Sequence, residues 1–212
     1  MNDAVLSYAT LHKVVGFLGI GLVPVVVIGS LLLDHPPVIQ VSVSAYYYTG
    51  MRDEMEGIIC GIALFLMCYH GYSTLDSVIS KLAGFFALGI AFLPTSDTSS
   101  KTDLLSILHY TTSGIFFALL AFMSIALFTK SAGHKTEQKI KRNRVYRVCG
   151  ILMAVSVVLI PIDEIGVIHA RIGFLKPTLI LETIALVSFG ISWLTKGEFI
   201  LKDKPLAFPI ND

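Results

Sequence analysis

Charged side chains are scarce in this chain of 212 residues, since Asp, Glu, Lys and Arg together make up only 15% of it. A soluble globular domain carries about 25%. Hydrophobic residues reach 54% and fall into long runs rather than into an amphipathic pattern. Runs of about 20 apolar residues are what a helix needs to cross a bilayer. The scarcity of charge therefore excludes an ordinary soluble domain and predicts an all-α integral membrane protein.

Cysteine is also rare, with only Cys60, Cys68 and Cys149 in the chain, each in or beside an apolar run. Their spacing fits neither a disulfide framework nor a zinc site. We expect them to be small core residues, with no cofactor and no metal. The sequence has no basic patch with interleaved aromatic residues, so a nucleic-acid partner is not expected.

Six apolar runs predict a bundle of six transmembrane helices. The predicted spans are residues 14–33, 51–69, 78–93, 104–129, 145–160 and 178–195. The first run is longer than the apolar core of a signal peptide, and no Ala-x-Ala cleavage site follows it. We therefore expect the first run to remain in the protein as a helix.

Lysine and arginine are divided unevenly between the two sides of such a bundle. With the N-terminus inside, twelve of them fall on the inner side and four on the outer side, which accounts for all sixteen. Positive charge accumulates in cytoplasmic loops. The sequence thus predicts an N-in/C-in topology with both termini cytoplasmic, a basic cytoplasmic loop over residues 130–144, and a place in the bacterial inner membrane.

The most polar stretch runs from Ser42 to Glu56 and leads into the second predicted span. Arg52 and Glu56 are four residues apart, so on a helix they share a face. At about 1.5 Å per residue, Glu56, His109 and Glu182 lie at one depth, roughly 7 Å below the outer surface. Ionisable side chains inside a membrane are costly and commonly mark a functional site. We predict that these three side chains line one polar pocket open to the outside.

The candidate pocket residues lie at the depth of these three side chains or closer to the outer surface. They are Arg52, Asp53, Glu56, His109, Asp163, Glu182, Tyr46 and Tyr47. The alternatives are separate ion pairs with snorkelling side chains, and an interfacial belt for the tyrosines. A Ser/His/Asp arrangement can also be assembled from Ser42 or Ser44 with His109 and Asp163. No His-x-x-x-His or Glu-x-x-His spacing supports a metal.

Small residues recur at four-residue spacing on three predicted spans. They are Gly57 with Gly61, Ala83 with Ala87 and Ala91, and Gly114 with Ala118. Such faces let membrane helices approach closely. The pattern leaves open whether they pack within one bundle or between the copies of a homo-oligomer.

Short segments of the chain carry a resemblance to known proteins. They are Ser42-Val-Ser-Ala-Tyr-Tyr, Arg52-Asp53, Leu82-Ala-Gly84 with Phe92-Leu-Pro94, and Ile107-Leu-His109. With them the chain resembles a widespread group of uncharacterised bacterial six-span membrane proteins. It is distantly similar to the DRAM/Sfk-type six-span proteins and to the CREST superfamily, which includes alkaline ceramidases.

The DRAM-like resemblance implies a membrane protein tied to lipid handling. The CREST resemblance implies a metal-dependent hydrolase of lipid amides, whose pattern has Ser-x-x-x-His on one helix and His-x-x-x-His on a late helix. Here Ser42 is followed four residues on by Tyr46, and the sixth predicted span has no histidine.

These observations favour binding or handling of a membrane lipid or another amphiphile in the predicted pocket, with Arg52 holding an anionic head group. One alternative is a membrane-embedded hydrolase, which requires a bound metal or a nucleophile within hydrogen-bond reach of a base. The other alternative is a transporter or channel subunit, which requires a solute path across the bundle.

Overall fold

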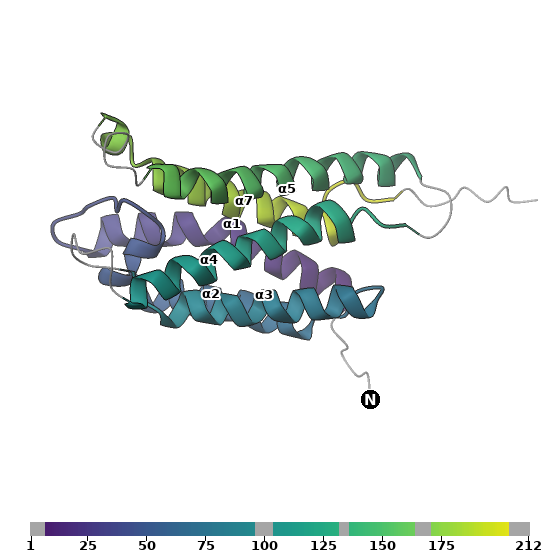
Figure 1. Ribbon diagram of the computed structural model, residues 1–212, viewed down its shortest axis with the longest axis horizontal. Coiled ribbons are helices and arrows are strands. Elements are labelled where there is room, and N and C mark those ends of the chain that lie inside the picture. Colours follow the sequence, from purple (N-terminus) through teal and green to yellow (C-terminus); the bar gives the residue numbers. More distant parts are fainter. Residues whose placement is uncertain (1–6, 96–103, 132–135, 164–170, 204–212) are drawn as a thin grey trace, which may run out of the picture.

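The structure is a computed structural model, and the residues that it describes are 7–95, 104–131, 136–163 and 171–203. Most of these residues are helical and none of them lies in a β-strand, which confirms the predicted all-α fold class. The α-helices are α1 Tyr8–Leu33, α2 Arg52–Cys68, α3 Thr74–Phe92, α4 Leu104–Phe122, α5 Glu137–Asp163 and α7 Pro177–Lys196. They lie side by side as an elongated bundle in which neighbouring helices are antiparallel (Figure 1).

Five of these helices are long and apolar enough to cross a membrane. They are α1, α3, α5, α7 and α4 with its continuation to Leu127. Helix α2 is shorter, with 17 residues, and two acidic residues, Asp53 and Glu54, stand in its first turn. The membrane-protein class is therefore supported by five helices, and a sixth span through α2 stays a prediction.

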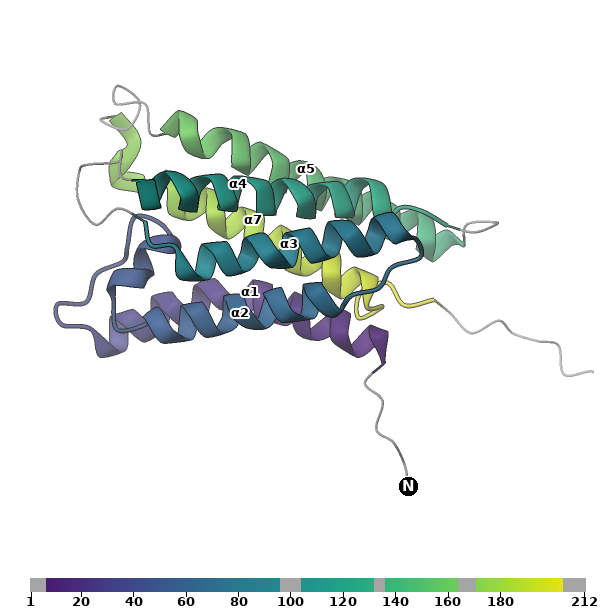
Figure 2. The ribbon, with the colours of Figure 1, turned by 60° about the horizontal axis from the view of Figure 1, so that its bottom comes forward.

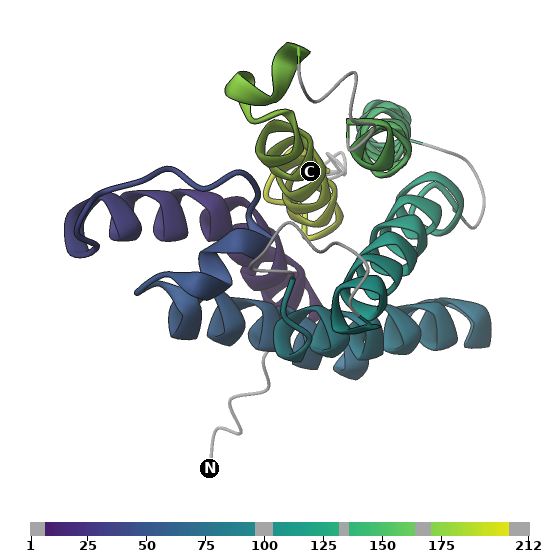
Figure 3. The ribbon, with the colours of Figure 1, turned by 60° about the vertical axis from the view of Figure 1, so that its left-hand side comes forward.

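Helix α1 packs against α2 and α7, α3 packs against α2 and α4, and α5 packs against α4 and α7. Helices α4 and α7 make little direct contact, and α5, which packs against both, comes between them around the bundle (Figure 3). The chain between α1 and α2 folds back over one end of the bundle and contains the short 3-10 helix η1, Ser44–Tyr48 (Figure 2). We call this end the η1 end and the opposite end, where α5 begins, the basic end.

Glycine sets the distance between α1 and α7. A Cβ atom added to Gly190 would lie 2.5 Å from the main-chain oxygen of Gly16, which is closer than real contacts allow. In contrast, a Cβ atom at Gly57 or at Gly114 would meet nothing within 4 Å. The fully buried alanines of α3, Ala83, Ala87 and Ala91, pack within the bundle. The small-residue faces thus differ, because those of α2 and α4 stay open at these glycines.

Several charged side chains at the basic end form ion pairs with one another. Asp76 is 2% exposed, and its carboxylate lies 3.0 Å from Lys130 Nζ. Arg142, which is also buried, contacts Asp203 at 2.6 Å and Glu198 at 3.5 Å. Helix α5 begins at Glu137, so residues 137–144 of the predicted basic segment are helical, and the cytoplasmic position of that segment stays a prediction. Their Lys, Arg and Gln residues are good helix formers, and the Arg142 contacts hold this first part of α5 in place.

A one-turn π-helix, Met123–Leu127, continues α4 toward the basic end. There the Ser124 hydroxyl donates to the Tyr146 carbonyl of α5 at 2.8 Å and lies 2.6 Å from Ser192 Oγ of α7. Since Ser124 has one proton, Ser192 is the donor in the second bond. This buried contact joins three helices.

Candidate ligand-binding pocket

The segment between α1 and α2 is fixed by its own hydrogen bonds. The Asp34 carboxylate accepts from the Gly50 main-chain N–H at 2.9 Å and thereby joins the two ends of the segment. The Ser42 hydroxyl accepts from the Ala45 N–H at 3.0 Å, which begins the tight turn of η1. This irregular backbone lies over the helix ends, and Val43 and Tyr46 are buried within it at 5% and 0% exposure.

The consecutive tyrosines of η1 have different surroundings. Tyr46 is fully buried, and its hydroxyl accepts from the Gln40 N–H at 3.3 Å. Burial raises the pKa of the Tyr46 phenol, so this side chain stays neutral. Tyr47 lines a cavity, and Tyr48 is 45% exposed and donates to the main-chain oxygen of Thr95. Of the two predicted tyrosines, only Tyr47 therefore reaches a cavity.

Helix α7 holds this segment through main-chain groups and one carboxylate. The Leu179 N–H, in the first turn of α7, donates to the Val41 carbonyl at 3.0 Å. One turn further along, the Glu182 carboxylate accepts from the Val43 N–H at 2.5 Å. The Ser44 hydroxyl lies 3.4 Å from the other Glu182 oxygen, which is a long contact. Glu182 thus fixes η1 to α7.

His109 of α4 reaches the same place from a third element. It is 3% exposed, with Nδ1 2.6 Å from the Leu93 carbonyl oxygen and Nε2 3.0 Å from Ser44 Oγ. Because a carbonyl only accepts, Nδ1 carries the proton, and Nε2 of the neutral ring accepts from Ser44. Ser44, His109 and Glu182, which we call the polar cluster, therefore connect α4, η1 and α7.

A single Ser44 proton serves two acceptors in the polar cluster. When it goes to His109 Nε2 at 3.0 Å, the Glu182 oxygen at 3.4 Å loses its hydroxyl donor. A ligand that donates a hydrogen bond to this Glu182 oxygen would complete the cluster. The cluster therefore retains capacity for a polar group from outside the chain.

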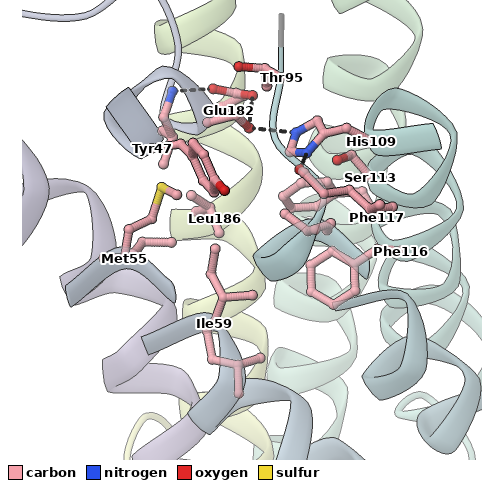
Figure 4. A pocket seen from close by; sticks show the side chains of 16 residues that line it. Tyr47, Met55, Ile59, Thr95, His109, Ser113, Phe116, Phe117, Glu182 and Leu186 are labelled. Atoms are coloured by element: carbon pink, nitrogen blue, oxygen red, sulfur yellow. Dashed lines mark hydrogen bonds between the residues drawn. The ribbon is translucent and has the colours of Figure 1, made fainter. Parts of the chain in front are cut away.

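A cavity of about 50 Å³ begins at the polar cluster. By volume it holds a few water molecules, at about 10–15 Å³ each. Most of its wall is apolar and comes from α1, α2, α3, α4 and α7. Figure 4 shows the His109 ring and the Glu182 carboxylate at one end of the cavity, and Phe116 and Ile59 further along it. The cavity lies between α4 and α7, the two helices that make little direct contact.

Two of the three predicted level residues meet at this cavity, and the third does not. His109 and Glu182 line it, whereas Glu56 pairs with Arg52 at 2.7 Å. The four-residue spacing of this pair explains the difference, since it gives the Glu56 carboxylate a partner on its own helix. Arg52 also donates to Tyr47 Oη at 2.6 Å, and its guanidinium carbon lies 4.0 Å from the centre of that ring. Arg52 therefore reaches the cavity rim only through Tyr47.

The other predicted residues lie elsewhere. Asp53 is exposed in the first turn of α2. Asp163 ends α5, and its side chain lies outside the described part of the structure. Among the residues that the structure describes, no group of three His, Cys, Asp or Glu side chains is placed to hold a metal ion.

Sequence reasoning named Ser44 beside His109 only as one choice in a Ser/His/Asp arrangement, and it did not name Ser113, which lies in the cavity wall. Ser44 lies in an irregular segment whose folding back has no periodic signature. Ser113 follows His109 by four residues, and this helical spacing would have placed it on the same face of α4.

Comparison with protein-family models, with curated proteins and with solved structures finds no match to this chain. The resemblance to six-span membrane proteins stays a prediction.

Proposed function

We propose that this protein binds a membrane amphiphile in the cavity at the η1 end. The observation that carries the proposal is the arrangement of a mostly apolar cavity with a polar cluster at one end of it. Ligand sites typically combine apolar walls with a few polar groups that fix orientation. A lipid offers the same combination, with a polar head group next to an apolar chain.

The proposal includes a topology. The basic end carries the lysines and arginines of α5 and of the ends of α4 and α7, so the positive-inside rule favours a cytoplasmic basic end. Both termini would then be cytoplasmic, α2 would complete six spans, and the η1 end would face outward from a bacterial inner membrane. The cavity would thus be within reach of the outer leaflet.

Arg52 is proposed to attract an anionic head group to the rim. Its side chain is 49% exposed, and it rests on the ring of Tyr47, which lines the cavity. The contact with Glu56 uses Nε, and the bond to Tyr47 uses Nη2. A guanidinium has five N–H donors, so donors remain for a carboxylate or phosphate.

The proposal is tested by native mass spectrometry of gently solubilised protein. Glu182→Gln removes the charge that holds η1, and Arg52→Ala removes the positive charge at the rim. We expect wild type to retain a lipid, and each variant to retain at least about tenfold less, as for loss of a hydrogen bond to a charged group. Glu54→Gln is the matched control, because Glu54 is exposed on α2. Unchanged retention in both Glu182→Gln and Arg52→Ala would rule the proposal out.

A hydrolase is the second candidate, favoured by one distance. Ser44 Oγ lies 3.0 Å from His109 Nε2, so a nucleophile is within hydrogen-bond reach of a base, and the Leu93 carbonyl orients that base. In this reaction Ser44 Oγ would bond to an acyl carbon while His109 takes its proton and passes it to the leaving alcohol. Water would then release the acyl group from Ser44.

A fluorophosphonate probe, which bonds to activated serines, distinguishes the two candidates. A hydrolase would be labelled at Ser44, with the label lost in Ser44→Ala and kept in Ser42→Ala. If Ser44 stays unlabelled while a lipid is retained, the protein binds the lipid without hydrolysing it.

A further inference from the structure

Helix α4 contains two buried hydroxyl groups that have no hydrogen-bond partner among the described residues, Ser106 Oγ and Ser113 Oγ. Only Ser113 lines the cavity. Figure 4 shows its oxygen on the cavity side of α4, next to His109. An unpaired hydroxyl buried among apolar groups is unfavourable unless something in the adjoining space satisfies it.

The usual partner of a helical serine is not engaged here. A serine in a helix commonly bonds back to the carbonyl four residues earlier, which for Ser113 is the carbonyl of His109. That carbonyl instead accepts from Thr112 Oγ1 at 2.9 Å. The Ser113 hydroxyl is therefore available to a group inside the cavity.

The cavity then offers polar groups at two depths. The polar cluster forms the first, and Ser113 lies one turn further along α4, which is about 6 Å at 1.5 Å per residue. The wall around Ser113 is apolar, with Phe116 and Phe117 on the same helix. A matching ligand has a polar head, a second hydrogen-bonding atom about 6 Å further along, and an apolar continuation.

We propose that Ser113 donates a hydrogen bond to the ester carbonyl that joins the head group of an acyl lipid to its chain. This inference rests on the proposed function and names the ligand class, an ester-linked acylglycerol lipid. An ester carbonyl accepts but does not donate, which suits a hydroxyl donor. The cavity of about 50 Å³ has room for the linkage and the first methylene groups.

The test compares two lipids that differ only at this carbonyl, 1-monooleoylglycerol and the ether 1-O-oleylglycerol. Each is titrated into the full-length protein in detergent, and retention is read by native mass spectrometry. We expect wild type to retain the ester about three- to tenfold more strongly than the ether, as for one neutral hydrogen bond. Ser113→Ala should remove this preference, and Ser106→Ala, the matched control on the same helix, should keep it.

The possible outcomes distinguish the ester contact at Ser113 from the proposed binding of an amphiphile. Equal retention of ester and ether by wild type overturns the ester contact and leaves amphiphile binding standing. Retention of neither lipid by wild type overturns the ester contact, whereas amphiphile binding is decided by the lipid that the gently solubilised protein retains. A preference that persists in folded Ser113→Ala also overturns the assignment. The wild-type ratio needs no variant, so the inference stays testable even if Ser113→Ala fails to fold.

Discussion

The two ends of the bundle each bury a histidine, and these histidines show how the ends differ. His12 donates from Nδ1 to the Tyr8 carbonyl at 2.5 Å, as His109 does to the Leu93 carbonyl at 2.6 Å. At the basic end, His12 Nε2 has no partner among the described residues, and the ring packs against the aromatic rings of Tyr69 and Trp193. At the η1 end, His109 Nε2 meets Ser44 beside a cavity.

The contrast teaches that burial of a polar side chain does not by itself mark a site. His12 and Asp76 are as deeply buried as His109, but they lie among aromatic rings or ion-pair partners. What distinguishes the η1 end is hydrogen-bonding capacity next to open space. The close glycine contact between α1 and α7 leaves no comparable space beside Gly16 and Gly190.

The largest expected effect comes from breaking that close contact. In Gly190→Ala the new methyl group would lie 2.5 Å from the Gly16 main-chain oxygen, so α1 and α7 must move apart. Overpacking of this kind costs about 1–3 kcal/mol. Gly57→Ala is the control and should leave the free energy of unfolding unchanged or raise it slightly, because its Cβ meets open space. Unfolding by SDS in mixed micelles measures both, and equal stabilities would contradict the close contact.

A somewhat smaller effect is expected at Asp76, which joins α3 to Lys130. Asp76 also accepts from the Tyr72 N–H at 2.9 Å and from the Ser73 hydroxyl at 3.0 Å, in a capping box at the start of α3. Asp76→Ala should lower the free energy of unfolding by about 1–2 kcal/mol through the lost cap and ion pair. Asp53→Ala, at an exposed position, should change it little. Lipid retention should be the same in both variants, and its loss in Asp76→Ala would end the contrast between the ends.

Substitution of His12 and of His109 gives the most direct test of the difference between the two ends of the bundle. His12→Phe and His109→Phe each lose one hydrogen bond to a carbonyl, and His109→Phe also loses the bond from Ser44. The free energy of unfolding should therefore fall by about 1 kcal/mol in His12→Phe and by about 1–2 kcal/mol in His109→Phe. Only His109→Phe removes the group that faces Ser44 and the cavity. Lipid retention by native mass spectrometry should fall in His109→Phe and persist in His12→Phe. Equal losses would mean that retention reports stability and not the site.

The smallest effect is expected from acid at the basic end. The hydrogen bond from Arg142 holds the pKa of the Asp203 carboxyl below its usual range. The stabilisation is therefore complete above the ordinary pKa of an aspartate, about 3.9, and is lost as pH falls through the lower folded value. The protection of residues 197–203 against hydrogen exchange, relative to the intrinsic exchange rate at the same pH, should fall in acid in wild type and be lower at neutral pH in Asp203→Asn. Because Asp203 is 40% exposed, the effect should stay below about 1 kcal/mol.

The sequence predicted the helices well because apolar runs of span length have few other structural solutions. The depth estimated from the rise per residue also placed His109 and Glu182 at the same end of the bundle, where they line one cavity. Glu56 was misplaced because the estimate fixed depth and left helix rotation open. The sequence could not choose between Ser42 and Ser44 as the partner of His109, because their positions depend on the irregular segment over the helix ends, which hydrophobic periodicity does not describe.

The bonds between the η1 segment and α7 also constrain the order in which the protein matures. Val43 and Glu182 are 139 positions apart, and α1 finds one of its main packing partners in α7. During synthesis the earlier helices emerge long before this partner does, and such distant contacts form late. The pocket is thus completed only when the last helix arrives, so a nascent chain stopped before α7 would lack both Glu182 and the support for η1. Under the proposed function, lipid capture would begin only after the whole bundle has been assembled.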